Sequence, residues 1–217
     1  MSNVEIALRR LIEVLDNVGK PVAANINPGL TQQDIMTRCQ QVNVTLPSEL
    51  VELYCYCDGM KPSLLSLPDT GEYGLEDFYL LLPLDEALKE YEKVLDVDKA
   101  LQGSERINRI SSYDASSFLW FPFLGEGGDL YLVDAAAEMT EPSVIWWGLE
   151  FSPVQKYCNL SAMFNTLADA YEAGAYEYSY NLPYLNENLQ MSLIARQRNP
   201  GVSYWQDRVQ ELSVSSL

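Results

Sequence analysis

The stretch FLWFPFLGEGGDLYLVD, residues 118–134, contains two apolar runs separated by a glycine-rich segment. The runs are Phe118–Leu124 and Leu130–Asp134, and Gly125–Asp129 between them is rich in residues that accept positive backbone φ angles. This pattern predicts a β-hairpin with a longer loop. Because Pro122 has no N–H to donate to a neighbouring strand, we expect the first strand to lie at a sheet edge or to carry a bulge.

Outside this hairpin, apolar residues at helical spacing alternate irregularly with short apolar runs. The runs Phe78–Leu82 and Ser143–Trp147 predict two more strands. Helices are expected near residues 4–18, 31–41, 48–57, 83–99, 159–171, 186–198 and 203–213. The third of them is expected to end at Asp58–Gly59, because glycine suits the residue that follows a helix.

Strands and helices that mix without strict alternation indicate an α+β fold rather than a doubly wound parallel sheet. We therefore expect all four strands to form one central, mostly antiparallel sheet flanked by helices, with a C-terminal helical extension. The helical residues expected to be buried against the sheet are Leu50, Leu53, Leu88, Phe164 and Leu167. The predicted domain division is 1–175 for the sheet-containing domain and 176–217 for an extension packed on it.

The composition excludes several classes of enzyme. The 217 residues include no histidine, which removes Ser-His-Asp and Cys-His nucleophile systems and most zinc enzymes. The four cysteines include no C-x-x-C pair, and the chain has neither a phosphate-binding loop nor a dinucleotide-binding fingerprint. We therefore expect no cofactor, no metal and no catalytic residue.

Charge is the second strong signal. The chain carries 14 basic and 31 acidic residues, a net charge of −17. The segment Ile110–Ala195 contains eleven acidic residues and one basic residue, Lys156, a net charge of −10. Such a surface repels nucleic acid and attracts a basic partner, although charge also serves solubility alone. No apolar run is long enough to span a bilayer and Met1–Ile12 lacks a secretory pattern, so the expected location is cytoplasmic, with no membrane partner.

Several motifs occur in the order found in one known family. Leu46-Pro47-Ser48-Glu49-Leu50 leads to Leu53-Tyr54 and Asp58-Gly59, which is similar to an "L-P-x-x-L … Y … (N/D)-G" helix. Phe78–Leu88 is similar to a strand that enters a "P-L-x-E-(A/I)" helix. Phe121-Pro122-Phe123, Gly128-Asp129-Leu130-Tyr131 and Asp134 are similar to an "(I/F)-P-(F/I) … G-D-x-(Y/W) … D" hairpin. Over about residues 1–175 the chain thus resembles the SUKH superfamily, which contains the yeast cell-wall assembly regulator and many bacterial immunity proteins.

The resemblance implies an α+β fold and a binding role without catalysis. Bacterial members of this kind typically bind and neutralise a toxin domain, often a nuclease, whereas a fungal relative is a hub of cell-wall synthesis and signalling. The acidity favours the first role, with a basic toxin domain as partner. A regulatory scaffold stays open as an alternative, and so does a Mg²⁺-using hydrolase built on carboxylates such as Glu76-Asp77 or Asp85-Glu86. The oligomeric state is left undetermined.

Candidate partner-binding residues are acids near the hairpin and exposed aromatic residues. Adjacent tryptophans on a strand face opposite sides, so we expect one indole in the core and the other available for contact. Three tyrosines at alternate positions would form one stripe on a strand, and packing beneath the C-terminal helices is the competing interpretation. The candidates are Glu126, Asp129, Glu138, Trp146, Trp147, Tyr176, Tyr178 and Tyr180.

Overall fold

The computed structural model describes residues 3–67, 73–76, 78–101, 120–135, 141–148, 153–175 and 188–215, of which the side chains at 96–101, 126 and 215 are outside the description. The helices are α1 (Asn3–Asn17), α2 (Gln32–Gln41), α3 (Ser48–Tyr56), α4 (Leu84–Leu101), α5 (Leu160–Glu172), α6 (Leu189–Arg198) and α7 (Ser203–Ser215), with a 3₁₀ turn at Ala23–Asn25. The strands are β1 (Ile26–Pro28), β2 (Cys57–Met60), β3 (Leu80–Leu81), β4 (Trp120–Glu126), β5 (Asp129–Asp134), β6 (Val144–Trp147) and β7 (Val154–Tyr157).

The predicted α+β architecture is confirmed. Five antiparallel strands form one sheet in the order β3-β4-β5-β6-β7, and β1 and β2 form a separate two-stranded ribbon. The four strands expected in one sheet are all there. Pro122 lies at a register shift in β4, a strand with neighbours on both sides. The bulge, and not an edge position, therefore explains how this strand accommodates a proline.

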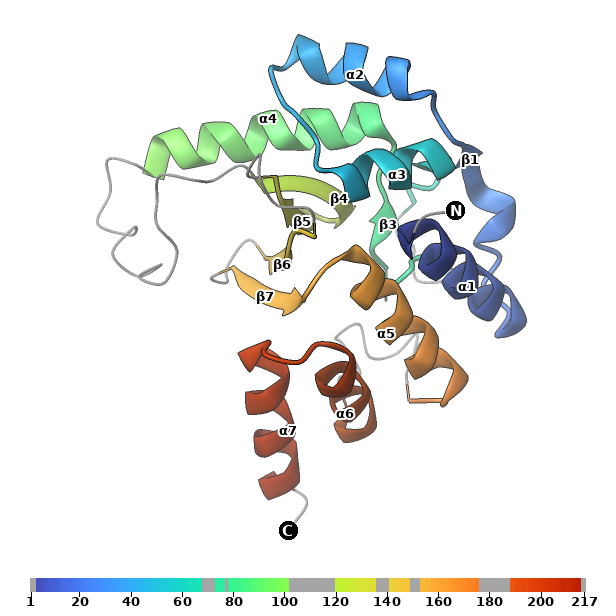
Figure 1. The fold of residues 1–217 in the computed structure, drawn as a ribbon, viewed down its shortest axis with the longest axis vertical. Helices are drawn as coiled ribbons and strands as arrows, with labels where there is room; N and C mark the ends of the chain where they lie inside the picture. Colours follow the sequence, from blue (N-terminus) through green and yellow to red (C-terminus); the bar gives the residue numbers. More distant parts are fainter. Residues whose placement is uncertain are drawn as a thin grey trace.

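The main core lies between this sheet and the helices α1, α3, α4 and α5. All five helical residues expected in it are buried, since Leu50, Leu53, Phe164 and Leu167 have no exposed surface and Leu88 is 7% exposed. Helix α1 adds seven buried residues from one amphipathic face. The C-terminal helices α6 and α7 lie beyond α5 and β7, on the side of the molecule away from α2 and α4 (Figure 1).

The segment Asp58-Gly59 does not end helix α3, contrary to the sequence-based expectation. The helix ends at Tyr56, and both residues belong to β2. Asp58 Oδ1 accepts a hydrogen bond from the backbone N–H of Leu84 at 2.8 Å, so its carboxylate caps the start of α4. Gly59 has a φ of +64°, and a Cβ there would lie 2.2 Å from the backbone N of Pro83. The Asp-Gly pair therefore joins β2 to the start of α4.

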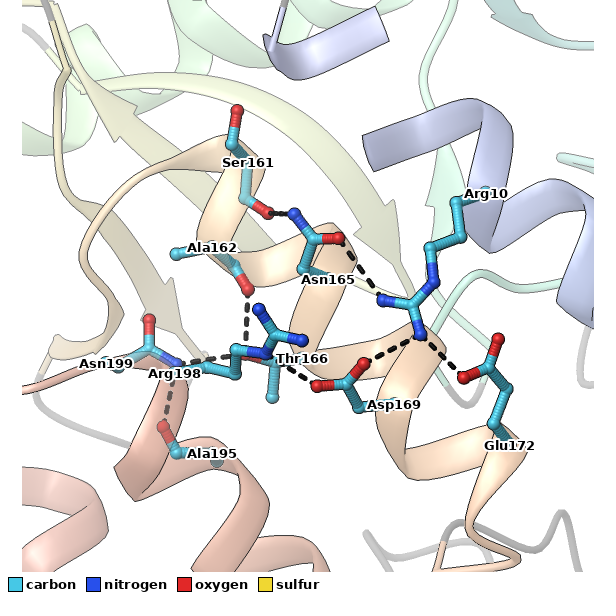
Figure 2. A network of polar contacts seen from close by, with 10 residues as sticks. All are labelled: Arg10, Ser161, Ala162, Asn165, Thr166, Asp169, Glu172, Ala195, Arg198 and Asn199. Atoms are coloured by element: carbon cyan, nitrogen blue, oxygen red, sulfur yellow. Dashed lines mark hydrogen bonds and ion pairs between the residues drawn. The ribbon is translucent and has the colours of Figure 1, made fainter. Parts of the chain in front are cut away.

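One carboxylate connects three helices at the side of the molecule. Asp169 of α5 pairs with Arg10 of α1 at 2.8 Å and with Arg198 of α6 at 2.6 Å (Figure 2). Arg10 also reaches Glu172 at 2.6 Å. The two guanidinium groups lower the pKa of Asp169 against an opposing contribution from burial. Helices near both ends of the chain are thus attached to one residue of α5.

Next to this ion-pair group, Asn199 connects the end of α6 to α5 and to β7. Its Nδ2 donates to Thr166 Oγ1 at 3.0 Å, and its Oδ1 accepts from the backbone N–H of Cys158 at 3.0 Å. Asn199 is 1% exposed. A buried amide with partners on two elements fixes how the C-terminal helices meet the sheet.

Candidate partner-binding site

Three of the candidate residues come together at the hairpin end of the sheet. Gly127 and Gly128 turn between β4 and β5 with φ angles of +58° and +101°. The register places Glu126 opposite Asp129, and the next residue of β5, Leu130, lies opposite Trp147 of β6. Asp129 is half-buried. Two acidic residues and one indole therefore occupy neighbouring positions on three adjacent strands.

The two adjacent tryptophans pack on opposite faces of the sheet, as expected. Trp146 packs against the main core, and its Nε1 donates a hydrogen bond to the Tyr79 hydroxyl at 2.9 Å. Trp147 packs against a second, smaller cluster made of Val94, Trp120, Leu130, Leu132 and Ile145. Both indoles are half-buried, so neither ring is fully enclosed and neither is fully exposed. Each has an edge that solvent reaches.

Glu138, Tyr176, Tyr178 and Tyr180 lie outside the described residues. The two helices expected after the tyrosines are present as α6 and α7.

A buried lysine near Trp146 was not among the sequence candidates. Lys156 of β7 is 1% exposed. Its Nζ lies 5.1 Å from the ring centre of Tyr204, 5.3 Å from Trp146, 5.8 Å from Trp205 and 5.9 Å from Tyr131. Aromatic faces at such distances attract a cation. The lysine ammonium is therefore held among four rings from β5, β6 and α7.

The position of Lys156 in the strand explains its orientation. Val144 pairs with Tyr157 and Ile145 pairs with Gln155, so Lys156 is the extra residue of a β-bulge. The backbone carbonyl of Lys156 accepts a hydrogen bond from the Trp205 indole N–H. The one feature of the sequence that pointed to this site is that Lys156 is the single basic residue of the acidic segment Ile110–Ala195.

The carboxylates considered for a hydrolase have structural partners. Glu76 has no exposed surface and accepts from the Tyr157 hydroxyl at 3.0 Å, while Asp77 lies outside the described residues. Asp85 pairs with Arg38 at 3.1 Å, and Glu86 pairs with Lys89 at 2.6 Å. Within the described ranges, no group of three or more histidine, cysteine or acidic side chains is arranged to hold a metal.

Glu49 of α3 is a buried acid whose carboxylate lies at the start of helix α5. It is 6% exposed, and its Oε2 accepts from the backbone N–H of Leu160 at 3.2 Å. Burial raises the pKa of Glu49 to about 7; the Leu160 bond opposes the rise, and Glu141 and Glu52 add to it by repulsion. Glu141 in turn accepts from Asn159 at 3.0 Å. An acid at a helix N-terminus is thus kept partly protonated near neutral pH.

Glu49→Gln is expected to change the free energy of unfolding more favourably at about pH 8 than at about pH 5. The difference should be on the order of 2 kcal/mol. The folded-state pKa of Glu49 is raised, so its contribution to stability is fully present below the unfolded pKa of about 4.5 and is lost as pH rises towards 7. Glutamine does not ionise and its oxygen still accepts from Leu160. Urea unfolding at both pH values measures this, with Glu13→Gln on the exposed face of α1 as control. Equal effects of Glu49→Gln at the two pH values would contradict the prediction.

Comparison with known proteins identifies a family. The family model described as SMI1 / KNR4 family (SUKH-1) matches residues 29–170. The match begins after α1 and ends within α5, and it includes the Asp58-Gly59 pair, the hairpin and the buried Lys156. No curated protein matches the chain. The helices of the described ranges include none with the length and hydropathy needed to cross a membrane.

Proposed function

Because this chain belongs to the SMI1 / KNR4 family (SUKH-1), we propose that it acts as an immunity protein that binds and neutralises a basic toxin domain. The family fits a non-catalytic module, and its proteins generally bind partner proteins. A nuclease is the toxin class that suits an acidic binder best, since a nuclease needs a basic surface to hold phosphates.

The observation that carries the proposal is the burial of Lys156. This residue is the one base in Ile110–Ala195, against eleven acids, and its ammonium lies among four aromatic rings and not at the surface. The positive charge of the segment is therefore withdrawn from solvent while acids such as Glu141 remain exposed. An approaching basic protein meets an electrostatic field dominated by carboxylates.

Most basic side chains of the described helices have acidic partners within the chain. Basic side chains of five helices are paired with acids of the same chain; these are Arg9, Arg10, Arg38, Lys89, Lys93, Arg198 and Arg208. Lys20 is buried and donates to the Tyr171 hydroxyl at 3.3 Å. These basic groups are therefore already engaged within the chain, whose net charge is −17.

The proposed contact surface is the hairpin end of the sheet with its neighbouring aromatic residues. Asp129, Glu126 opposite it and Glu138 later in the chain are proposed to attract the basic partner electrostatically. The half-buried Trp147 is proposed to pack against that partner. Trp146, on the other face of the sheet, and the tyrosines at 176, 178 and 180 are proposed as further contacts. The proposal includes a cytoplasmic location, which suits four free thiols, and a division into a binding domain, 1–175, and an extension, 176–217.

Electrostatic steering predicts a salt-dependent association rate. Proteins captured by the purified chain from a lysate of its own host at low salt would be identified and purified. A basic protein with nuclease activity that is inhibited at one-to-one stoichiometry is the expected result. Its association rate should fall at least about tenfold between about 0.05 and 0.5 M salt, while dissociation changes less.

Site variants then separate a specific surface from overall charge. The triple variant Glu126→Gln, Asp129→Asn and Glu138→Gln should slow association more than a charge-matched triple variant at Glu13, Asp16 and Asp207, which lie on α1 and α7. Trp147→Ala should mainly speed dissociation. An association rate indifferent to salt would end the electrostatic proposal. Partners captured without any inhibited activity would support the regulatory scaffold, and an EDTA-sensitive hydrolysis by the chain itself would support the hydrolase.

A further inference from the structure

Trp146, Val154 and Tyr204 lie around the buried Lys156, and all three are half-buried. Trp146 of β6 and Val154 of β7 are directly paired, so their side chains lie on the same face of the sheet. Tyr204 belongs to α7, and its ring centre lies 5.1 Å from the Lys156 Nζ, which is 5.3 Å from the Trp146 ring. These three residues, from two strands and one helix, are called the Trp146–Tyr204 surface.

Buried contacts fix the two rings of this surface. The Trp146 Nε1 donates to the Tyr79 hydroxyl at 2.9 Å, and Tyr79 is 6% exposed. The Tyr204 ring packs edge-to-face on Trp205, with 4.9 Å between the ring centres. The Trp205 indole N–H in turn donates to the Lys156 carbonyl, which attaches α7 to β7. The rings are therefore held in place before any partner arrives, so binding has few side chains left to order.

The chemistry of the Trp146–Tyr204 surface favours an apolar side chain over a charged one. Val154 offers only carbon atoms, and the single N–H of Trp146 is already donated to Tyr79. The Lys156 ammonium lies against both rings and uses their attraction for a cation. A second cation placed against the same rings would be repelled by it. An aliphatic or aromatic side chain meets no like charge and needs no hydrogen bond there.

The Trp146–Tyr204 surface lies beside the proposed contact surface at the hairpin end of the sheet. Trp146 precedes Trp147, which is paired with Leu130, and Leu130 follows Asp129. The acidic residues of the hairpin attract a basic protein to this end of the sheet. Charge complementarity therefore brings a basic partner to the place where these apolar groups are exposed.

We propose that the Trp146–Tyr204 surface binds an apolar side chain of the basic partner, one that is flanked in the partner by lysine or arginine residues. The inference rests on the proposed function for the charge of the partner. It goes beyond that function by assigning Val154 and Tyr204 as contact residues and by separating two tasks. The carboxylates near the hairpin attract the partner, and the apolar surface between β6, β7 and α7 retains it.

Synthetic peptides test this proposal without a toxin. They have the sequence Lys-Ser-Lys-Ser-X-Ser-Lys-Ser-Lys, with leucine, serine or lysine at X. Titration followed by NMR of the isotope-labelled full chain should give a dissociation constant about fivefold lower for the leucine peptide than for the serine peptide. At about 0.15 M salt the lysine peptide should bind more weakly than the leucine peptide, because the Lys156 ammonium repels the added charge.

Variants locate the preference for leucine. Either Tyr204→Ala or Val154→Thr should reduce the ratio of the leucine and serine affinities to less than about twofold. Val154→Thr adds a hydroxyl with little change in shape, so it gives the decision if Tyr204→Ala does not fold. Gln206→Ala, at an exposed position of α7, is the matched control and should keep the full ratio.

Three outcomes would overturn the proposal. They are equal affinities of the leucine and serine peptides for the wild type, a leucine preference that Val154→Thr leaves intact, and tightest binding by the lysine peptide. In each of them the peptides still bind through charge, so the attraction of a basic partner stands. If none of the peptides binds even at low salt, the proposed function and this inference are both contradicted.

Discussion

Gly59→Ala is expected to destabilise the protein by about 3–4 kcal/mol. Gly59 has a φ of +64°, a conformation that disfavours any side chain by about 1 kcal/mol. A Cβ would also lie 2.2 Å from the Pro83 nitrogen and 2.4 Å from the Leu82 carbonyl carbon, both backbone atoms. These atoms cannot move without shifting the start of α4, which the adjacent Asp58 caps. Overpacking of this kind adds about 2–3 kcal/mol.

Gly127→Ala separates the two contributions. Gly127 has a nearly identical φ of +58°, but no atom lies within 4 Å of the position a Cβ would take. Its replacement should therefore destabilise the protein by about 1 kcal/mol, the conformational part alone. Urea denaturation of both variants measures the difference. Equal destabilisation at the two glycines would show that the approach of β2 to residues 82–83 is not what requires glycine at position 59.

Trp205→Ala is expected to destabilise the protein by about 3–5 kcal/mol. The indole has no exposed surface, packs 5.9 Å from Tyr157 and 4.9 Å from Tyr204 between ring centres, and donates to the Lys156 carbonyl. Alanine would leave a cavity beside a lysine ammonium and a carbonyl that has lost its donor. The amides of α6 and α7 should also lose protection from hydrogen exchange, because the buried ring joins α7 to Tyr157 of β7.

Val214→Ala provides the control for this helix. Val214 lies on the same helix and is 67% exposed, so its truncation should change stability by less than about 0.5 kcal/mol. Thermal unfolding and amide exchange of the two variants would be compared. A Trp205→Ala protein that loses less than about 1 kcal/mol and keeps its α7 amides protected would show that the helix does not depend on this contact.

Local patterns in the sequence were sufficient to predict much of the fold. The hairpin was predictable because Gly127 and Gly128 stand between two apolar runs, and the caps of α2 and α5 were predictable from Thr31 and Asn159, which accept from Asp34 and Ala162. Strand β7 was missed because its bulge at Lys156 interrupts the alternation by which strands are recognised.

Contacts between distant segments could not be predicted in this way. Gly59 was interpreted as a helix end because the approach of Leu82 and Pro83 depends on the tertiary fold. The burial of Lys156 was equally hidden, since lysine is almost never fully buried and its four rings come from segments far apart in the chain. For both residues, the local sequence favours a more common role: the end of a helix for Gly59 and an exposed position for Lys156.

The bridging of α1 and α6 by Asp169 bears on what constitutes an autonomous folding unit. The family match covers residues 29–170, yet α1, which precedes it, contributes seven buried residues, and Arg10 of α1 shares a carboxylate with Arg198 of α6. A chain trimmed to the matched residues would retain every motif by which the family is recognised. It would lose α1 and therefore one side of its hydrophobic core. The residues that the family model matches and the residues that fold as one cooperative unit therefore have different limits.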